Sequence, residues 1–376
     1  MAHHLLTMTD LGFLPQALVL HRSLRETGAD FRLWVLCMDE PSRRALEPLP
    51  GVETMPLAEL EAADPALGPT RANRTWREYC WTATPSFVLH ALERHPPAGP
   101  LTWVDADVMF FREPGWMTGA LDGGSILLTP HRYYRVYPSA APAELLHEQY
   151  GRFNGGTISF RADEQGLAAA RLWRERTLEW CHFRTEPGRF GNQRYLQDWP
   201  ERFAGVRVLR SPGAGLAPWN APRYRIEAGP GGPVAEGEPV LFYHYQSLRL
   251  HRLGPGLGRW SHPPNWFRLP APANELVART DVHIRKSRAE RRLLWRPYLA
   301  RLAEAVRTVE EANGGFVADL PVARMGDAAA DARRKVELNS SRLSPRLRRA
   351  ARRENTLGRA HSRQGSVLEQ ADYLRR

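Results

Sequence analysis

The chain has 376 residues, of which 43% are hydrophobic, enough for a core in one large domain or two smaller ones. Its three cysteines, Cys37, Cys80 and Cys181, are odd in number and far apart, which argues against a disulfide framework or a cysteine zinc site. The net charge of +11 is uneven, with +1 in residues 1–270 and +10 in residues 271–376. We see no signal peptide and no run of about 18 apolar residues, so we expect a reduced, cytoplasmic protein.

Short apolar runs alternate with amphipathic stretches in the first half of the chain. Strands are expected at residues 3–9, 31–38, 52–57, 101–104 and 125–130. Helices are expected at 11–27, from Asp39 onward, at 84–95 with Thr84-Pro85 as the start signal, and at 167–183. This alternation predicts an α/β fold with a Rossmann-like, mostly parallel central sheet flanked by helices. Further along we expect a glycine turn at 154–156 leading into a strand, strands at 206–209 and 240–245, and a Gly/Pro loop at 228–237.

Two carboxylates interrupt the apolar stretch 101–111. Asp105 and Asp107 follow residues 101–104, which have the composition of a buried parallel strand, and residues 108–111 resume that strand. Since side-chain direction repeats every two residues on an extended backbone, both carboxylates should face the same way. Buried carboxylates are costly unless paired, and Mg²⁺ or Mn²⁺ would compensate them. A strand-end turn with solvated acids is the alternative interpretation.

Four motifs occur in this order along the chain: Asp105-Ala106-Asp107, Asn154-Gly155-Gly156, Gly191-Asn192-Gln193 and His244. Together they resemble the motifs of metal-dependent glycosyltransferases of the GT-A fold. The chain is similar to the retaining group that includes glycogenin and bacterial lipooligosaccharide galactosyltransferases. It is more similar still to a bacterial family of glycosyltransferases, through the runs 190–200 and 212–220. The resemblance covers about residues 3–250.

The resemblance implies an enzyme that moves a hexose from a nucleotide-diphosphate sugar, UDP-linked in the similar groups, to a glycan or glycolipid acceptor. The implied ligands of Mn²⁺ or Mg²⁺ are Asp105, Asp107 and His244. The implied donor-binding residues are Thr7, Thr9, Asp10, Asp105, Ala106, Asn154 and Gly155. Gln193 would lie beside the reacting carbon. Asn192 stands where the similar families usually have an aspartate that binds hydroxyls of the donor sugar.

The stereochemistry stays open at this point. Retention by front-side attack needs no strong protein base, because the leaving phosphate accepts the proton, and the Gln193 amide can orient groups but cannot titrate. Inversion would need a base, for which Asp198 is the nearest candidate in sequence. Asn192 favours another alternative, a nucleotide-sugar-binding protein with weak catalysis. Structural roles are the remaining alternatives: a core histidine at 244, a turn former at Asn154 and a hydrogen-bonding Gln193.

The pattern changes after residue 264. We expect a catalytic domain at residues 1–265 and a helical, partly disordered, Arg-rich extension at residues 266–376, with a long helix at 290–312. Such a charge run is usually a solvated surface. Peripheral contact with the anionic inner membrane is the alternative, and no nucleic-acid partner is expected.

Overall fold

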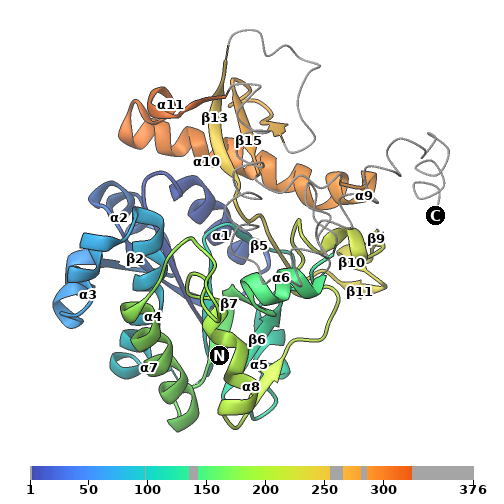
Figure 1. Ribbon diagram of the computed structural model, residues 1–376. Helices are drawn as coiled ribbons and strands as arrows, with labels where there is room; N and C mark the ends of the chain where they lie inside the picture. The colour runs from blue at the N-terminus through green and yellow to red at the C-terminus, as the bar shows by residue number, and fades with distance from the viewer. Residues whose placement is uncertain (1, 98, 135–142, 255–265, 281–285, 324–376) are drawn as a thin grey trace, which may run out of the picture.

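The computed structural model of the chain describes residues 2–97, 99–134, 143–254, 266–280 and 286–323 (Figure 1). Within these ranges, no helix combines the length and the apolar character needed to cross a bilayer.

A seven-stranded sheet forms the centre of the protein. Its strands are β1 (His3–Thr9), β2 (Phe31–Cys37), β3 (Val52–Pro56), β4 (Leu101–Val104), β6 (Ile126–Pro130), β7 (Phe153–Phe160) and β8 (Val206–Val208). They lie in the order β3-β2-β1-β4-β7-β6-β8, and only β7 is antiparallel to its neighbours. The predicted α/β fold with a mostly parallel sheet is therefore confirmed. The carboxyl ends of β1, β2 and β4 meet at one edge, where β7 begins.

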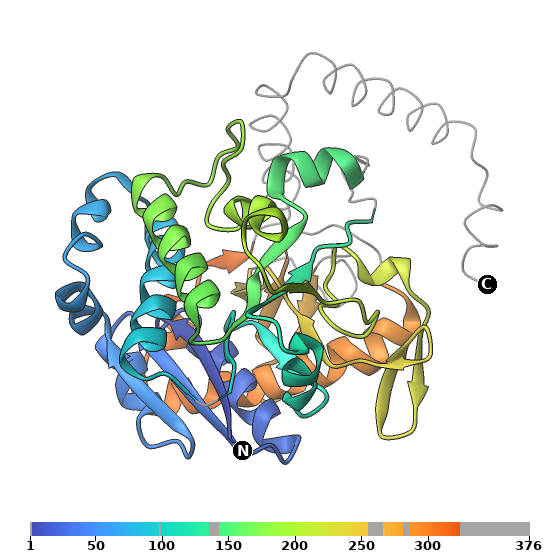
Figure 2. The same cartoon turned by 90° about the horizontal axis from the view of Figure 1, so that it is seen from below.

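Helices cover both faces of this sheet. Leu5 and Leu6 are consecutive in β1 and belong to separate hydrophobic cores, because side chains alternate between the faces of a strand. On one side, α1 (Leu14–Glu26) packs against α10 (Arg296–Asn313). On the other side, α4 (Trp76–Arg94) packs against α7 (Glu164–Glu179). Figure 2 shows α4 and α7 in teal and green on one side of the blue strands and α10 in orange toward the other.

The helix expected at residues 84–95 begins earlier, at Trp76. Thr75 and Glu78 form a capping box, in which the Thr75 hydroxyl accepts the Glu78 N–H and the Glu78 carboxylate accepts the Thr75 N–H. Pro85 therefore lies inside α4 rather than at its start. The prediction of a helix start at Thr84-Pro85 was wrong, because the capping box is the stronger start signal.

Two segments expected to be loops or turns are strands. Residues 154–156 lie inside β7, whose pairing with β6 shifts register between Leu128 and Thr129. The glycine-rich stretch around residues 228–237 lies in a three-stranded antiparallel sheet of β9 (Ile226–Gly229), β10 (Gly232–Ala235) and β11 (Glu238–Pro239). Both glycine clusters were interpreted as turns because glycine is common there, yet here glycine allows irregular or tightly turning strands.

The described residues after 265, namely 266–280 and 286–323, share a hydrophobic core with the earlier part of the chain. A second sheet contains β13 (Arg249–Leu253), β14 (Trp266–Arg268), β15 (Leu276–Arg279) and β16 (Val322–Ala323). The expected boundary at residue 265 falls between β13 and β14, which belong to this one sheet. Pairing between distant strands is not visible in the sequence. The long helix expected at 290–312 is present as α9 (Arg288–Glu290), a π-helical turn η4 (Arg291–Trp295) and α10. The expected disorder beyond Gly326 lies outside the described residues.

The remaining elements connect these units. They are the strands β5 (Val108–Phe110) and β12 (Phe242–His244), the helices α2 (Glu40–Leu46), α3 (Leu57–Ala63), α5 (Gly115–Leu121), α6 (Ala143–Tyr150), α8 (Trp199–Arg202) and α11 (Phe316–Asp319), and the 3₁₀ turns η1 (Gly68–Asn73), η2 (Arg194–Asp198) and η3 (Ala221–Arg223). β5 and β12 form a separate two-stranded antiparallel sheet.

Candidate metal centre

The two aspartates lie on a turn between strands of different sheets. β4 ends at Val104, and the N–H of Val108 donates to the carbonyl of Asp105 across 3.1 Å, which closes the turn. β5 then leaves the central sheet and pairs with β12. The expectation that residues 108–111 resume the strand 101–104 was therefore wrong, because an apolar run alone does not show which strand each half pairs with.

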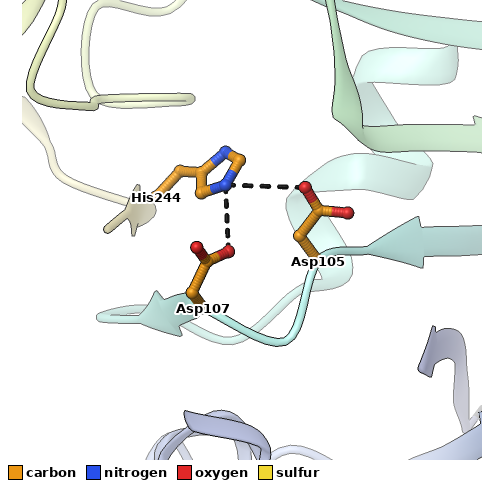
Figure 3. Close-up of side chains that lie close together, drawn as sticks. All are labelled: Asp105, Asp107 and His244. Atoms are coloured by element: carbon orange, nitrogen blue, oxygen red, sulfur yellow. Dashed lines mark ion pairs between the residues drawn. The ribbon is translucent and has the colours of Figure 1, made fainter. Parts of the chain in front are cut away.

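The turn nevertheless brings both carboxylates to one histidine. Nε2 of His244, at the end of β12, lies 3.0 Å from Oδ1 of Asp107 and 3.5 Å from Oδ2 of Asp105 (Figure 3). The side chains of His244 and Asp107 are 4% and 8% exposed, whereas that of Asp105 is 39% exposed. The group is thus buried at its base and open to solvent on the side of Asp105.

These three residues fit a divalent cation. Nε2 of His244 is buried and makes no hydrogen bond of acceptable geometry with any described residue, although it lies close to both carboxylates. Neighbouring ligand atoms around an octahedral ion, each about 2.1 Å from the metal, lie about 3 Å apart, close to the separations found here. Two oxygens and one imidazole nitrogen suit Mn²⁺ or Mg²⁺, with the imidazole favouring Mn²⁺. In the described part of the chain, these three residues form the one group of acidic, histidine or cysteine side chains arranged to hold a metal.

Proton binding by Asp105 and His244 depends on their surroundings. Burial raises the pKa of Asp105 to about 6, and the Asp107 carboxylate adds to this rise while His244 opposes it. Burial lowers the pKa of His244, but the two carboxylates outweigh this effect and raise it above its ordinary value. A bound cation would favour the deprotonated form of every ligand.

Asn154 contacts the second ring nitrogen of His244. Its Nδ2 is 3.2 Å from Nδ1 of His244, and its Oδ1 accepts the N–H of Gly156 across 2.6 Å. A partner at the second ring nitrogen fixes the orientation of a metal-binding histidine. The sequence suggested a contact between Asn154 and the donor sugar, and it did not reveal this contact with His244.

The two glycines after Asn154 lie between the metal group and the Asn192-Gln193 segment. A Cβ atom on Gly156 would lie 2.5 Å from Oδ2 of Asp105 and 2.6 Å from Cε1 of His244. A Cβ atom on Gly155 would instead lie 3.0 Å from Cβ of Gln193 and 3.2 Å from Oδ1 of Asn192. The structure therefore brings the four sequence motifs together, with the glycine backbone as the wall between them.

Two hydrogen bonds hold the segment 192–193 in place. Nε2 of Gln193 donates to the carbonyl of Tyr150 across 2.9 Å, and Nε1 of Trp173 donates to the carbonyl of Asn192 across 2.8 Å. Tyr150 is the last residue of α6 and Trp173 lies in α7, so the first contact fixes the orientation of the Gln193 amide and the second fixes the backbone before it.

The end of β1 places the expected base-binding residues at the same edge of the sheet. Thr7 is buried, and its hydroxyl has no hydrogen-bond partner in the part of the chain that the structure describes. The Thr9 hydroxyl donates to the carbonyl of Asp10 across 3.0 Å, and the Asp10 carboxylate accepts the N–H of Phe13 at 3.0 Å and Nε1 of Trp76 at 2.8 Å. Ala106 is buried between the two site aspartates in sequence.

Asp39 also lies at this edge of the sheet, although the sequence indicated it only as the start of a helix. Its carboxylate accepts the N–H of Leu11 at 2.7 Å and the N–H of Ser42 at 2.9 Å, so it ties the loop after β1 to the start of α2. The helix-start pattern was the visible signal, while the contact with Leu11 required the structure.

Asp198 occupies a different environment. Its carboxylate accepts two hydrogen bonds from the Arg176 guanidinium, at 3.0 and 2.9 Å, and one from Arg202 at 3.0 Å. Although burial opposes it, bonding to these arginines lowers the pKa of Asp198 below its ordinary value. Asp198 therefore forms ion pairs with Arg176 of α7 and Arg202 of α8.

Two relatives from Bacillus subtilis (strain 168) match most of this sequence. The uncharacterized protein YfnD is 33% identical over 230 residues, which cover 61% of this chain and 72% of YfnD. The chain belongs to the same family as YfnD. The uncharacterized protein YfnF of this family is 33% identical over 249 residues, which cover 65% of this chain and 81% of YfnF. No protein-family model matches the chain.

Several solved structures are similar to this chain, at low sequence identity. Mouse xyloside xylosyltransferase 1 has a TM-score of 0.42 and 14% identity, covering 65% of this chain and 98% of that protein. The galactosyltransferase LgtC, solved with donor and acceptor sugar analogs, has a TM-score of 0.41 and 14% identity, covering 65% and 87%. The glycosyltransferase GlyE of Streptococcus pneumoniae TIGR4 has a TM-score of 0.34 and 14% identity, covering 56% and 45%.

Proposed function

We propose that this protein is a metal-dependent glycosyltransferase that moves a hexose from a nucleoside diphosphate sugar, UDP-linked in the groups it resembles, to a glycan or glycolipid acceptor. The convergence of Asp105, Asp107 and His244 at the carboxyl edge of the parallel strands is the observation that carries this proposal. Ligands bind at this edge in open α/β sheets. The exposed side of the group, at Asp105, leaves room for the diphosphate of a donor.

Each residue has a role in this proposal. Asp107 and His244 would hold the cation from the buried side, and Asp105 would hold it from the exposed side. A cation bound there would supply Lewis-acid stabilisation of the negative charge on the departing nucleoside diphosphate. The Gln193 amide is fixed by Tyr150 and offers a preorganised dipole beside the donor, which fits transfer with retention. Asn192 takes the position of an acid in the resembling families.

An aromatic cluster beside Gln193 supports a carbohydrate acceptor. The rings of Trp81, Phe183 and Phe190 lie 5.7 to 6.2 Å apart, and Phe183 is 42% exposed. A Cβ atom on Gly191 would lie 3.2 Å from the Trp81 ring, which places the cluster next to the 191–193 segment. Aromatic faces offer apolar area at low conformational cost, and the C–H faces of sugar rings match them.

Two alternatives remain to be separated from this proposal. An inverting transferase that uses Asp198 as base would have to release that carboxylate from Arg176 and Arg202. Asp198→Asn should then abolish turnover, whereas the retaining proposal expects activity close to that of the unmodified protein. A nucleotide-sugar-binding protein without transfer is motivated by Asn192. It would bind a donor in the presence of Mn²⁺ but would release no nucleoside diphosphate.

A thermal-shift screen of nucleotide sugars tests the proposal. A ligand that binds the native state raises the melting temperature, so the true donor should do so with Mn²⁺ and not with chelator. No stabilisation by any nucleotide sugar, with or without Mn²⁺, would overturn the proposed donor class. Contact of the Arg-rich tail with an anionic membrane stays a prediction, because most of that tail lies outside the described residues.

A further inference from the structure

Both neighbours of the site histidine are anchored to the C-terminal helices. Tyr243 and Tyr245 flank His244 and are fully buried. Because side chains alternate along a strand, His244 faces the carboxylates while the two tyrosines face the opposite way. There the ring of Tyr245 stacks on Tyr298 of α10, with centroids 3.6 Å apart and planes 12° apart.

Hydrogen bonds attach both tyrosines to the first turns of this helical segment. The Tyr243 hydroxyl donates to Oε1 of Glu290 across 3.0 Å, and the Tyr245 hydroxyl donates to the carbonyl of Leu294 across 2.7 Å. Nε1 of Trp295 lies 3.2 Å from the same Glu290 oxygen and donates to it. The π-helical turn η4 lies at this contact, and such turns are frequent at functional positions.

Glu290 is an unusual residue for a core. It is 1% exposed, and burying a carboxylate is costly unless charged and polar partners compensate it. Lys286 lies nearby, with its ammonium 4.6 Å from the Trp295 ring centroid and 5.1 Å from that of Phe267. The N–H of Glu290 donates to the Ser287 hydroxyl across 3.0 Å, which fixes the start of the helix.

Tyr245, directly after β12, also contacts Asp107 of the metal group. The N–H of Tyr245 donates to the carbonyl of Asp107 across 2.8 Å. Tyr245 is therefore bonded to the site turn through its backbone and to Leu294 through its hydroxyl. A shift of residues 290–298 would move His244 and Asp107 together.

We propose that the segment α9–η4–α10 positions the metal centre, with Glu290 as the principal positioning residue acting through Tyr243. The cation requires ligand atoms held within a few tenths of an ångström, and groups that fix the ligands commonly change metal affinity by about 10- to 100-fold when removed. This inference rests on the proposed function only in that the site binds a divalent cation.

The Mn²⁺ affinity of the donor-free, full-length protein tests this role. It is measured from the electron paramagnetic resonance signal of free Mn²⁺. Glu290→Ala should weaken Mn²⁺ binding by about tenfold, while Glu290→Gln, which keeps an acceptor for the Tyr243 hydroxyl, should weaken it less. Tyr243→Phe removes one hydroxyl and keeps the ring, so it serves if Glu290→Ala fails to fold, and it should weaken binding in the same direction.

Val309→Ala is the matched control. Val309 is equally buried in α10 but lies about 20 Å along the helix from Trp295 at 1.5 Å per residue. This variant should lower the melting temperature and leave the Mn²⁺ affinity within about twofold of the unmodified protein. Equal Mn²⁺ affinity in the Glu290 variants, Tyr243→Phe and the control would overturn the positioning role. Absence of Mn²⁺ binding by the unmodified protein would instead overturn the proposed metal-dependent function itself, and this role with it.

Discussion

Asn154 and His244 lie side by side in the core, with Nδ2 of the asparagine 3.2 Å from Nδ1 of the imidazole. The other end of the Asn154 amide accepts the N–H of Gly156, the glycine that lies against Asp105. The Asn-Gly-Gly motif thus forms one wall of the metal centre: its amide orients the histidine, and its glycine leaves space for the carboxylate.

Gly156→Ala tests this wall. The added methyl group would lie 2.5 Å from Oδ2 of Asp105 and 2.6 Å from Cε1 of His244, so we expect loss of Mn²⁺ binding. Gly156 has no positive φ, so alanine suits its backbone and the effect should come from the crowded site. Calorimetric titration with Mn²⁺ measures it.

Gly119→Ala is the control for this substitution. Gly119 lies in α5, no atom of the described residues lies within 4 Å of its added methyl group, and its φ is not positive. Alanine there should leave Mn²⁺ binding unchanged and stabilise the helix by up to about 1 kcal/mol. If Gly156→Ala bound Mn²⁺ as tightly as Gly119→Ala does, the close packing of Gly156 against the metal ligands would not matter for binding, and this role of the motif would be refuted.

The stabilisation that Mn²⁺ gives should shrink as the pH falls through about 6. The pKa of Asp105 is raised to about 6 and that of His244 is raised, so the metal-free native state binds protons there more tightly than the unfolded chain. These two groups therefore make the metal-free protein more stable as the pH falls, while protons displace the metal. Melting temperatures with Mn²⁺ and with chelator, at about pH 8 and about pH 5, measure the difference. An equal Mn²⁺ effect at both values would contradict the assigned ligands.

Gln193→Ala should lower turnover by about 10²- to 10³-fold while donor affinity changes little, because one preorganised polar group beside the reacting carbon is removed. Gln165→Ala is a suitable control, since the Gln165 amide accepts the N–H of Ala204 at the protein surface. Steady-state rates and donor titrations separate the two effects. A weaker donor affinity with unchanged turnover would make Gln193 a binding residue only.

Part of this site was visible in the sequence for clear physical reasons. Carboxylates at Asp105 and Asp107 after an apolar run, and the alternation of strands and helices, predicted the edge of an α/β sheet. The capping box at Thr75 and Glu78 was also present in the sequence, but the Thr84-Pro85 pair was preferred as the helix start. The start of α4 could therefore have been predicted from the sequence by choosing the capping box, which is the stronger of the two signals.

The rest depended on contacts between distant parts of the chain. Nothing near residue 108 shows that β5 pairs with β12 rather than continuing β4. Glu290 begins an Arg-rich amphipathic stretch and looks like a surface residue, yet the hydroxyl of Tyr243 holds it in the core. The extension expected after residue 265 was inferred from charge, whereas Trp295 packs against Tyr243 and Tyr298 packs against Tyr245 in the hydrophobic core.

Release of nucleoside diphosphate from the donor found by the thermal screen tests the central claim most directly. The unmodified protein should release it in the presence of Mn²⁺ and stop when a chelator is added. Asp107→Asn keeps the size of the side chain but removes a buried ligand charge, so it should fold and show no Mn²⁺-dependent release. Equal release by the unmodified protein and by Asp107→Asn, or release that continues in chelator, would contradict a metal-dependent transferase built on Asp105, Asp107 and His244.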